Sequence, residues 1–262
     1  MIETLVNNFQ VFLLVLFRTI ALFETAPLFS SSAFPQTAKI GLSLFASAGV
    51  FPMVLARGYP IPGSPVEYFL LIVGEAMLGL ILGFMLQMIF SAFQTAGHFF
   101  SLQMGFGASE VFDPLAQVEI PLMGEFLNLV AMLVFVVISG AGKFLLLGVA
   151  RSFQSIRAVD LALHKDGLIQ VLVQGLSGMF LTALTISFPI LGTLILVSIT
   201  MGLLAKASPQ MDVLTMGFPL SIGVAFILIF AALPLLMTAM EKIIDAGFTS
   251  LGAVMSGLGG SQ

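Results

Sequence analysis

The chain has 262 residues, of which 59% are hydrophobic and only 8% are charged, and its formal net charge is −4. Ordinary soluble domains carry about 25% charged residues, so this composition indicates a membrane protein. The small negative charge and the lack of a basic cluster argue against nucleic-acid binding. The absence of Cys excludes disulfides, thiol catalysis and Cys-based metal sites.

Hydrophobic runs define the predicted elements in chain order. They cover residues 9–29, 40–56, 66–93, 122–149, 168–205 and 213–240. A membrane-spanning helix needs about 20 predominantly apolar residues, so the sequence predicts an all-α membrane protein of about six hydrophobic segments, built as helical hairpins. The run 168–205 is too long for one crossing of a bilayer, and Pro189 near its middle is expected to kink or break it.

Two charges interrupt the first hydrophobic run. Arg18 and Glu24 do not share a helix face, so they cannot pair with each other. Charges at membrane depth are expensive unless they are paired or solvated, so each is expected to find a partner elsewhere in the fold. These charges, together with the lack of a basic region before the run, argue against a cleaved signal peptide.

A stripe of polar and small residues lies within the third run. Its members recur every four positions and so share one helix face: Glu75, Gly79, Gly83 and Gln87. Small residues let helix backbones approach closely, and polar residues hydrogen-bond across the contact. The stripe is therefore predicted to be a helix-packing or subunit contact with Glu75 as a buried, partnered anchor. A proton or ion relay through Glu75 is the alternative, and Glu125 and Asn128 of the next run are the candidate partners.

A polar, Gly-bearing interval, SLQMGFGASEVFDPLAQVEIP, separates the third and fourth runs at residues 101–121. It contains three acids and no Lys or Arg, and yet it keeps the apolar side chains Met104, Phe106, Val111 and Phe112. Gly105 and Gly107 flank Phe106, and Asp113-Pro114 is a turn signal. Apolar side chains on a flexible connector are suited to filling a hole. An ordinary loop packed on neighbouring helices is the alternative.

The segment 150–167 breaks the hydrophobic pattern and is the predicted boundary between two parts, 1–160 and 161–262. Its apolar residues follow helical spacing, and a helix lying on the membrane surface is compatible with them: Phe153, Ile156, Val159 and Leu163. After Lys242 a second apolar series alternates by four and three: Ile244, Phe248, Leu251, Met255 and Leu258. This series predicts a C-terminal amphipathic helix packed on a partner subunit or on its own bundle.

Motifs of catalysis are missing from the sequence. It has no HExxH, no Walker loop, no Gly-x-Ser-x-Gly and no Rossmann fingerprint, and His98 and His164 are isolated. We therefore expect neither an enzyme nor a bound metal or cofactor. A stand-alone secondary transporter that uses Glu75 and Glu125 is the alternative from a different functional class.

Four segments carry a resemblance to a known family. QMGFGASEVFDP followed by GEFLNLVAMLVF closely resembles the FliR family of flagellar export-apparatus proteins and its counterpart in virulence type III secretion. GEAMLGLILGF upstream and KASPQMDVLTMGFP downstream also look like that family, and together the patterns extend from about residue 10 to residue 240. The family often has a further residue between Gly107 and Ala108, and Glu110 departs from its pattern.

The resemblance implies a structural and gating subunit of the flagellar type III protein-export channel, in the bacterial inner membrane at the flagellar basal body. Its implied partners are FliP and FliQ subunits around the channel, FlhB and FlhA, membrane lipid and exported unfolded flagellar proteins. A FliP-like part would cover 1–160 and a FliQ-like hairpin with the C-terminal helix 161–262. Residues 104–114 are similar to the plug that helps to close the channel: Met104, Gly105, Phe106, Gly107, Val111, Phe112, Asp113 and Pro114.

Overall fold

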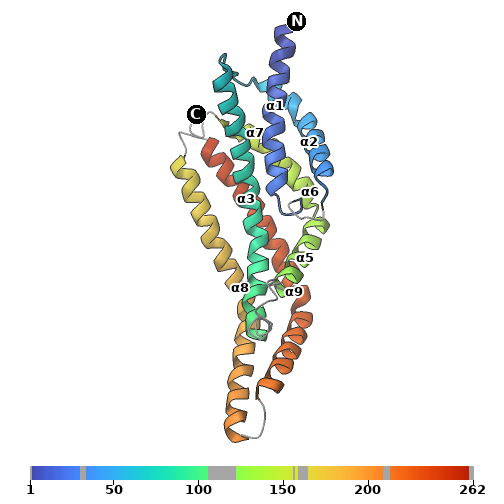
Figure 1. Cartoon of the computed structure of the whole chain (residues 1–262), viewed down its shortest axis with the longest axis vertical. Coiled ribbons are helices and arrows are strands. Elements are labelled where there is room, and N and C mark those ends of the chain that lie inside the picture. Colours follow the sequence, from blue (N-terminus) through green and yellow to red (C-terminus); the bar gives the residue numbers. More distant parts are fainter. Residues whose placement is uncertain are drawn as a thin grey trace, which may run out of the picture. The chain divides into compact units, whose positions relative to one another are not determined.

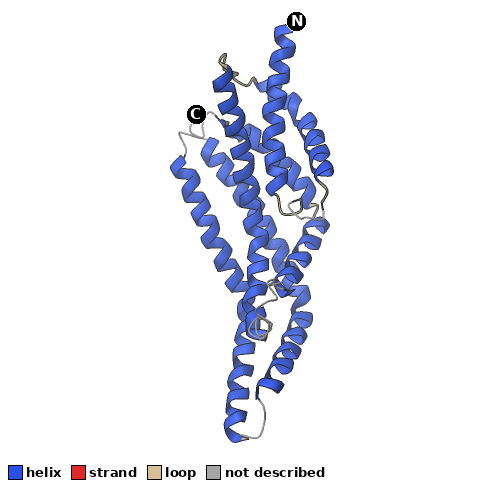
Figure 2. Cartoon of the chain, viewed as in Figure 1, coloured by secondary structure: helices blue, strands red, loops and turns tan. Residues whose placement is uncertain are grey.

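The computed structural model describes residues 2–29, 34–105, 122–155, 157–158, 165–208 and 213–259. Within these ranges the regular structure is entirely helical (Figure 2). The elements in chain order (Figure 1) are α1 (Ile2–Thr25), α2 (Gln36–Arg57), α3 (Pro65–Met104), α5 (Leu122–Val137), α6 (Gly140–Lys143), the π-helix η1 (Phe144–Ala150), α7 (Arg151–Ser155), α8 (Lys165–Ala207) and α9 (Val213–Gly259). The predicted all-α fold is confirmed.

The number of hydrophobic segments also agrees with the sequence. In the described part of the chain, five helices are long and apolar enough to cross a membrane, and a sixth is added if α5 and the stretch Gly140–Ser155 form one span. The protein is therefore a membrane protein. The 43 residues of α8 extend for about 65 Å at 1.5 Å per residue, whereas the hydrocarbon core of a bilayer is about 30 Å thick. A helix of this length extends beyond the hydrocarbon unless it is strongly tilted.

Pro189 does not break the fifth run. Helix α8 continues through it from Lys165 to Ala207, so a break at this position is wrong. A Pro inside a helix removes one hydrogen bond, but local adjustments and Ser or Thr side chains can satisfy the freed groups. The carbonyl oxygen that loses its helical donor is that of Thr185, four residues before Pro189. The two nearby Thr hydroxyls bond other carbonyls: Thr193 donates to Pro189 over 2.9 Å, and Thr185 donates to Leu181 over 2.8 Å.

The fourth run is broken where the sequence predicts one segment. Helix α5 ends at Val137, and the helical stretch that begins at Gly140 is bent away from it by 76°. Ser139 adopts a left-handed conformation with φ of 58°. A Cβ at Gly140 would overlap the ring of Phe135, so the turn needs glycine there. The seven-residue π-helix η1 follows, which is unusual because π-helices are rare.

The described helices form two compact units, each assembled from separate stretches of the chain. Unit 1 comprises residues 1–89, 135–175 and 244–262, and unit 2 comprises 90–134 and 176–243. Both ends of the chain thus belong to unit 1. This division groups residues by their proximity in space, whereas the boundary near residue 160 comes from a break in the hydrophobic pattern along the sequence and from the family resemblance. The division into 1–160 and 161–262 therefore stays a prediction.

Each unit has its own apolar core. In unit 1, α1 packs beside α2 and buries Leu14, Val15 and Leu22, and the rings of Phe23 and Phe144 meet edge to face with centroids 5.0 Å apart. In unit 2, α3 contributes a fully buried face made of Phe93, Ala96, Phe100 and Met104. Helices α5, α8 and α9 also contribute fully buried residues to this unit, among them Leu127, Leu194 and Ala225.

The end of α9 packs on the chain's own bundle. Ile244, Phe248, Leu251 and Met255 are all buried within unit 1, while the side chain of Leu258 lies outside the described ones. Phe248 stacks on Phe135, with ring centroids 6.2 Å apart. Of the two alternatives for the C-terminal helix, packing on its own bundle is confirmed.

Candidate functional site

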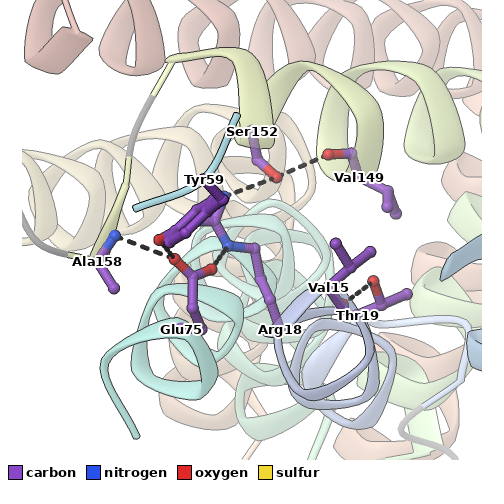
Figure 3. Close-up of polar contacts among 8 residues, drawn as sticks. All are labelled: Val15, Arg18, Thr19, Tyr59, Glu75, Val149, Ser152 and Ala158. Carbon is purple, nitrogen blue, oxygen red and sulfur yellow. Dashed lines mark hydrogen bonds and ion pairs between the residues drawn. The ribbon is translucent and has the colours of Figure 1, made fainter. Parts of the chain in front are cut away.

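Glu75 and Arg18 form an ion pair in the interior of unit 1. Arg18 is on α1 and Glu75 on α3, and their side chains are 1% and 0% exposed. The Arg18 Nε donates to Glu75 Oε2 over 2.5 Å (Figure 3). The expectation that Arg18 and Glu24 find partners elsewhere is confirmed, because Glu24 pairs with Lys39 of α2 over 3.3 Å.

The second carboxylate oxygen of Glu75 binds two further groups. The Tyr59 hydroxyl, from the turn between α2 and α3, donates to Oε1, and so does the Ala158 backbone N–H over 3.1 Å. Figure 3 shows the carboxylate lying between these donors and Arg18. A buried carboxylate needs such partners, because an uncompensated charge in the interior costs several kcal/mol, of the order of 3–5 kcal/mol when a partner is lost.

Arg18 is held on its other side by α7. Its Nη1 donates to the Ser152 hydroxyl over 3.4 Å, and the Ser152 hydroxyl donates to the Val149 carbonyl oxygen over 2.7 Å. The guanidinium carbon also lies 4.1 Å from the centre of the Phe153 ring, a cation–π contact. Four segments that are distant in the sequence therefore meet at one ion pair: α1, α3, the turn at Tyr59 and the stretch from α7 to Ala158.

The electrostatics of this cluster keep Tyr59 neutral. Burial, and then the negative charge of Glu75, hold the pKa of the Tyr59 phenol well above its usual value of about 10. Tyr59 therefore acts as a donor to the carboxylate and does not ionise. The described residues contain no group of three or more side chains suited to hold a metal ion. The polar contacts of the cluster join α1, α3 and α7.

The predicted stripe on α3 faces α1 at its two glycines. A Cβ at Gly79 would overlap the Arg18 carbonyl oxygen and lie 2.9 Å from Ala21, and a Cβ at Gly83 would overlap the Thr25 side chain. Glycine at both positions is therefore what brings α1 close enough for Arg18 to reach Glu75. The amide oxygen of Gln87 is buried and has no hydrogen-bond partner among the described residues.

Glu125 and Asn128 of α5, the predicted partners of Glu75, do not bind it. Its carboxylate binds Arg18, Tyr59 and Ala158, while the Glu125 carboxylate accepts a hydrogen bond from Gln94 Nε2 over 2.8 Å. Glu125 and Asn128 lie on α5 in unit 2. The face shared by these two residues follows from helical spacing, but spacing cannot say which helix meets which.

Several members of the cluster have no recognisable signal in the sequence. Tyr59 lies in a Gly- and Pro-containing turn without periodicity, and Ala158 contributes only its backbone N–H. Gly97 and Gly124 were also missed, although a Cβ at Gly97 would overlap the backbone of Gly124 and a Cβ at Gly124 would lie 2.9 Å from the Gln94 carbonyl oxygen. Among the partners of Glu75, Arg18 had a signal in the sequence, its charge within an apolar run.

The predicted plug residues are described only at their start. Met104 is the last residue of α3 and is completely buried in unit 2. Gly105 follows with φ of 92°, and a Cβ there would overlap the ring of Phe218 on α9. The other predicted plug residues lie outside the described ones: Phe106, Gly107, Val111, Phe112, Asp113 and Pro114.

The helices and the buried ion pair together define an integral membrane protein in which polar contacts fasten long apolar helices to one another. Residues 9–247 match the family described as "Bacterial export proteins, family 1". The chain therefore belongs to this family of bacterial export proteins.

Individual relatives agree with the family match. The chain is similar to the "Flagellar biosynthetic protein FliR" of Bacillus subtilis (strain 168), with 32% identity over 92% of this chain and 93% of that protein. It is also similar to the proteins of that name from Escherichia coli (strain K12), with 28% identity over 93% and 92%, and from Borreliella burgdorferi, with 28% identity over 92% and 89%. The resemblance to the FliR family is confirmed.

Proposed function

We propose that this protein is a structural and gating subunit of the flagellar type III protein-export channel in the bacterial inner membrane. The observation that carries the proposal is the match to bacterial export proteins over residues 9–247, joined by relatives that are named flagellar biosynthetic proteins. The proposed partners are FliP and FliQ subunits, with FlhB and FlhA nearby, and the proposed cargo is unfolded flagellar protein.

The surface of the helices supports a subunit that is covered by other molecules. Large apolar side chains along α8 are more than half exposed: Phe180, Leu181, Phe188 and Leu196. Lipid or neighbouring subunits must cover such a surface, because large exposed apolar areas are unfavourable in water. The length of α8, about twice the hydrocarbon thickness, supports neighbouring protein along part of it.

The transporter alternative is not favoured by the geometry at Glu75. A relay residue must exchange protons or ions, whereas this carboxylate is fully buried and is occupied by Arg18, Tyr59 and Ala158. Glu75 is better suited to holding α1 and α3 together.

The gating part of the proposal concerns residues 104–114. Met104 is buried, and Gly105 lies under Phe218, so these two residues are suited to fixing the start of the segment. The side chains proposed to close the pore are therefore Phe106, Val111 and Phe112, whose apolar character would exclude water and ions. The acids of the segment would position it.

Deletion of residues 107–113 tests the gate and leaves Met104 and Gly105 in place. We expect the export complex to assemble but the membrane to become permeable to small ions and metabolites. Small-solute leakage in cells that carry the assembled complex is the measurement, and leakage equal to wild type would contradict a sealing role. Cells with the Phe106→Ser variant should leak small solutes, and cells with the Phe106→Leu variant should not. This pair distinguishes the loss of an apolar side chain from the effect of any substitution at this position. Gly107→Pro should slow export while keeping leakage low, because it stiffens the segment.

A further inference from the structure

A polar patch lies across α3 and α5 in unit 2, and we define it as Ser91, Gln94 and His98 on α3 with Glu125 and Asn128 on α5. Positions 91, 94 and 98 share one helix face, as do 125 and 128. His98 and Glu125 are exposed and the other three are half-buried. The hydrogen bond from Gln94 Nε2 to Glu125 Oε1, 2.8 Å long, joins the two helices within the patch.

A close helix crossing holds this patch in shape. At Gly97 and Gly124 the backbones of α3 and α5 are so near that a Cβ on either glycine would be too close to the opposite backbone. A Cβ on Gly124 would also lie 3.2 Å from the His98 ring. The patch is therefore carried on two closely packed helices, and its side chains are presented together at a fixed spacing.

The surroundings of the patch are apolar. Leu122, Leu129 and Leu133 lie on the Glu125 side of α5 and are 51%, 61% and 58% exposed. Leu102 of α3 is 67% exposed. Lipid is an unsuitable cover for the polar side chains, because polar and charged groups are costly in hydrocarbon. Water is an unsuitable cover for the exposed leucines. A protein surface with a polar centre and apolar flanks can cover both the polar side chains and the exposed leucines.

The charge of the patch indicates which protein chemistry fits. Among the described residues, Glu125 is bonded by the neutral amide of Gln94, and the patch contains a carboxylate but no Lys or Arg. Two copies of the chain meeting through this surface would bring two carboxylates together, which is unfavourable. A cationic or amide donor from a different polypeptide would complement it, since hydrogen bonds to charged groups are the strong ones.

We propose that the polar patch docks an apolar helix of another polypeptide, which places a Lys, Arg or amide donor against Glu125 and apolar side chains against the flanking leucines. This inference rests on the proposed function only in that it requires a neighbouring subunit. The patch would then determine where that subunit binds and in which register, because a polar contact within an apolar interface is satisfied in one alignment alone.

Photo-crosslinking from Ser91 tests the proposal in the assembled complex. A benzophenone amino acid is introduced at position 91 and, as the matched control, at Leu181 on α8, which is 67% exposed. Mass spectrometry then locates each adduct. The expected adduct at position 91 lies in an apolar helix of a different polypeptide, within two turns of a Lys, Arg, Asn or Gln. An adduct to lipid, to a second copy or to the chain itself, or the absence of any adduct, would overturn the proposal.

Charge changes at Glu125 show whether the contact depends on the carboxylate. Glu125→Gln should lower the yield of the position-91 adduct about threefold, the factor that corresponds to an average interhelical hydrogen bond in a membrane. Glu125→Lys should abolish it, and changing the donor located by mass spectrometry to Glu should restore it. The Leu181 adduct should be unchanged in all variants, and so should the unfolding temperature of the isolated chain, because Glu125 is exposed. An adduct yield independent of the charge at position 125 would overturn the proposal.

Labelling of a single introduced Cys distinguishes a hydrated surface from a docked one. The chain contains no natural Cys, so Ser91→Cys is a unique thiol. A membrane-impermeant maleimide should react with it at least tenfold more slowly in the complex than in the isolated, detergent-solubilised chain. Equal rates would mean that the patch faces water, and the proposal would fail. If the complex still assembles and exports in that case, the proposed function is unaffected.

Discussion

At the residue scale, the ion pair of Arg18 and Glu75 is significant because each member depends on the other. Removing two charges from water costs about as much as their attraction returns, so a complete buried pair contributes little net stability. Losing one member leaves an uncompensated charge in the interior. The effect of a substitution at this pair is therefore expected to depend strongly on whether one or both charges are removed.

Glu75→Gln should destabilise the isolated chain by about 3 kcal/mol, because it leaves the Arg18 guanidinium buried without a counter-charge. The double variant Arg18→Met with Glu75→Leu should recover most of that loss, since it removes both charges. Thermal unfolding of the detergent-solubilised variants measures both effects. A Glu75→Gln chain as stable as wild type would contradict the anchor role.

Export by the same Glu75→Gln variant tests the relay alternative. Gln keeps the shape and the capacity to accept hydrogen bonds but cannot take up a proton. If the complex assembles normally and export is abolished, a relay through Glu75 would replace the anchor role. We expect any loss of export to follow the loss of assembled complex.

The environment of Tyr59 predicts an alkaline dependence of stability. Burial and the adjacent Glu75 raise the pKa of Tyr59, so the folded chain holds this proton more tightly than the unfolded chain does. The stabilising contribution is therefore complete below pH about 10 and is lost as the pH rises above that value. In the Tyr68→Phe variant, Tyr59 is the only tyrosine, and its phenolate absorbance should appear only as the chain unfolds.

A reversible titration near pH 10 with the helical circular dichroism retained would contradict the burial of Tyr59. The Tyr59→Phe variant is the matched control, because it keeps the ring and removes the hydroxyl that binds Glu75. It should show no phenolate signal in the Tyr68→Phe background.

At the element scale, the contact of α1 with α3 depends on glycine. Gly79→Leu should separate the two helices, because even a Cβ at this position would overlap the Arg18 carbonyl oxygen. We expect a lower unfolding temperature and loss of complex assembly. Gly49→Leu on α2 is the matched control, since a Cβ at Gly49 meets no atom within 4 Å in the described chain. Normal complex yield with Gly79→Leu would show that this contact is dispensable.

The end of α9 is a second element whose packing can be tested. Truncation after Lys242 removes Ile244, Phe248, Leu251 and Met255 from the core of unit 1. The ion pair of Lys143 with Asp245, 2.5 Å long, is partly exposed and is worth at most about 1 kcal/mol, so the packing of the apolar residues should dominate. We expect the truncated chain to unfold at lower temperature and to be degraded faster in cells.

Truncation after Gly259 removes only the last three residues and is the control for the loss of α9 packing. This shorter truncation should leave the unfolding temperature unchanged. Equal stability of the two truncated chains would mean that the buried apolar series does not support unit 1.

At the scale of the whole molecule, the connection between the two predicted parts can be cut. The Ala158 N–H binds Glu75, and a Cβ at Gly74 would lie 3.0 Å from the Ala158 side chain, so the chain is anchored up to residue 158. A cut between Asp160 and Leu161 keeps this anchor in the first fragment. Co-expressed fragments should therefore assemble and support export, as expected when few contacts are interrupted.

A cut between Ser155 and Ile156 is the comparison, because it separates Ala158 from the fragment that contains Glu75. It should complement less well than the cut after Asp160. Since residues 165–175 and 244–262 complete unit 1, neither fragment should be stable alone. Failure of both cuts, with all fragments present in the membrane, would argue against a boundary near residue 160.

Much of the fold could be predicted from the sequence, because it depends on local pattern. The apolar runs determine where helices form, since every backbone group must be satisfied inside a bilayer. Helical spacing determined the face shared by Glu75, Gly79 and Gly83, and the buried face at the end of α9. Spacing between charges determined that Arg18 and Glu24 could not pair with each other.

Only the tertiary structure decided which faces meet. Arg18 and Glu75 are separated by 57 positions. Ala158 binds Glu75 through its backbone N–H, a group that every residue except proline has, so the residue type at this position does not predict the contact. The structure likewise decided that α8 continues through Pro189 and that the chain turns at Ser139, where the ring of Phe135 leaves no room for a Cβ at Gly140. A local pattern fixes the periodicity of a helix, but the pairing of helices is set by contacts between residues far apart in the chain.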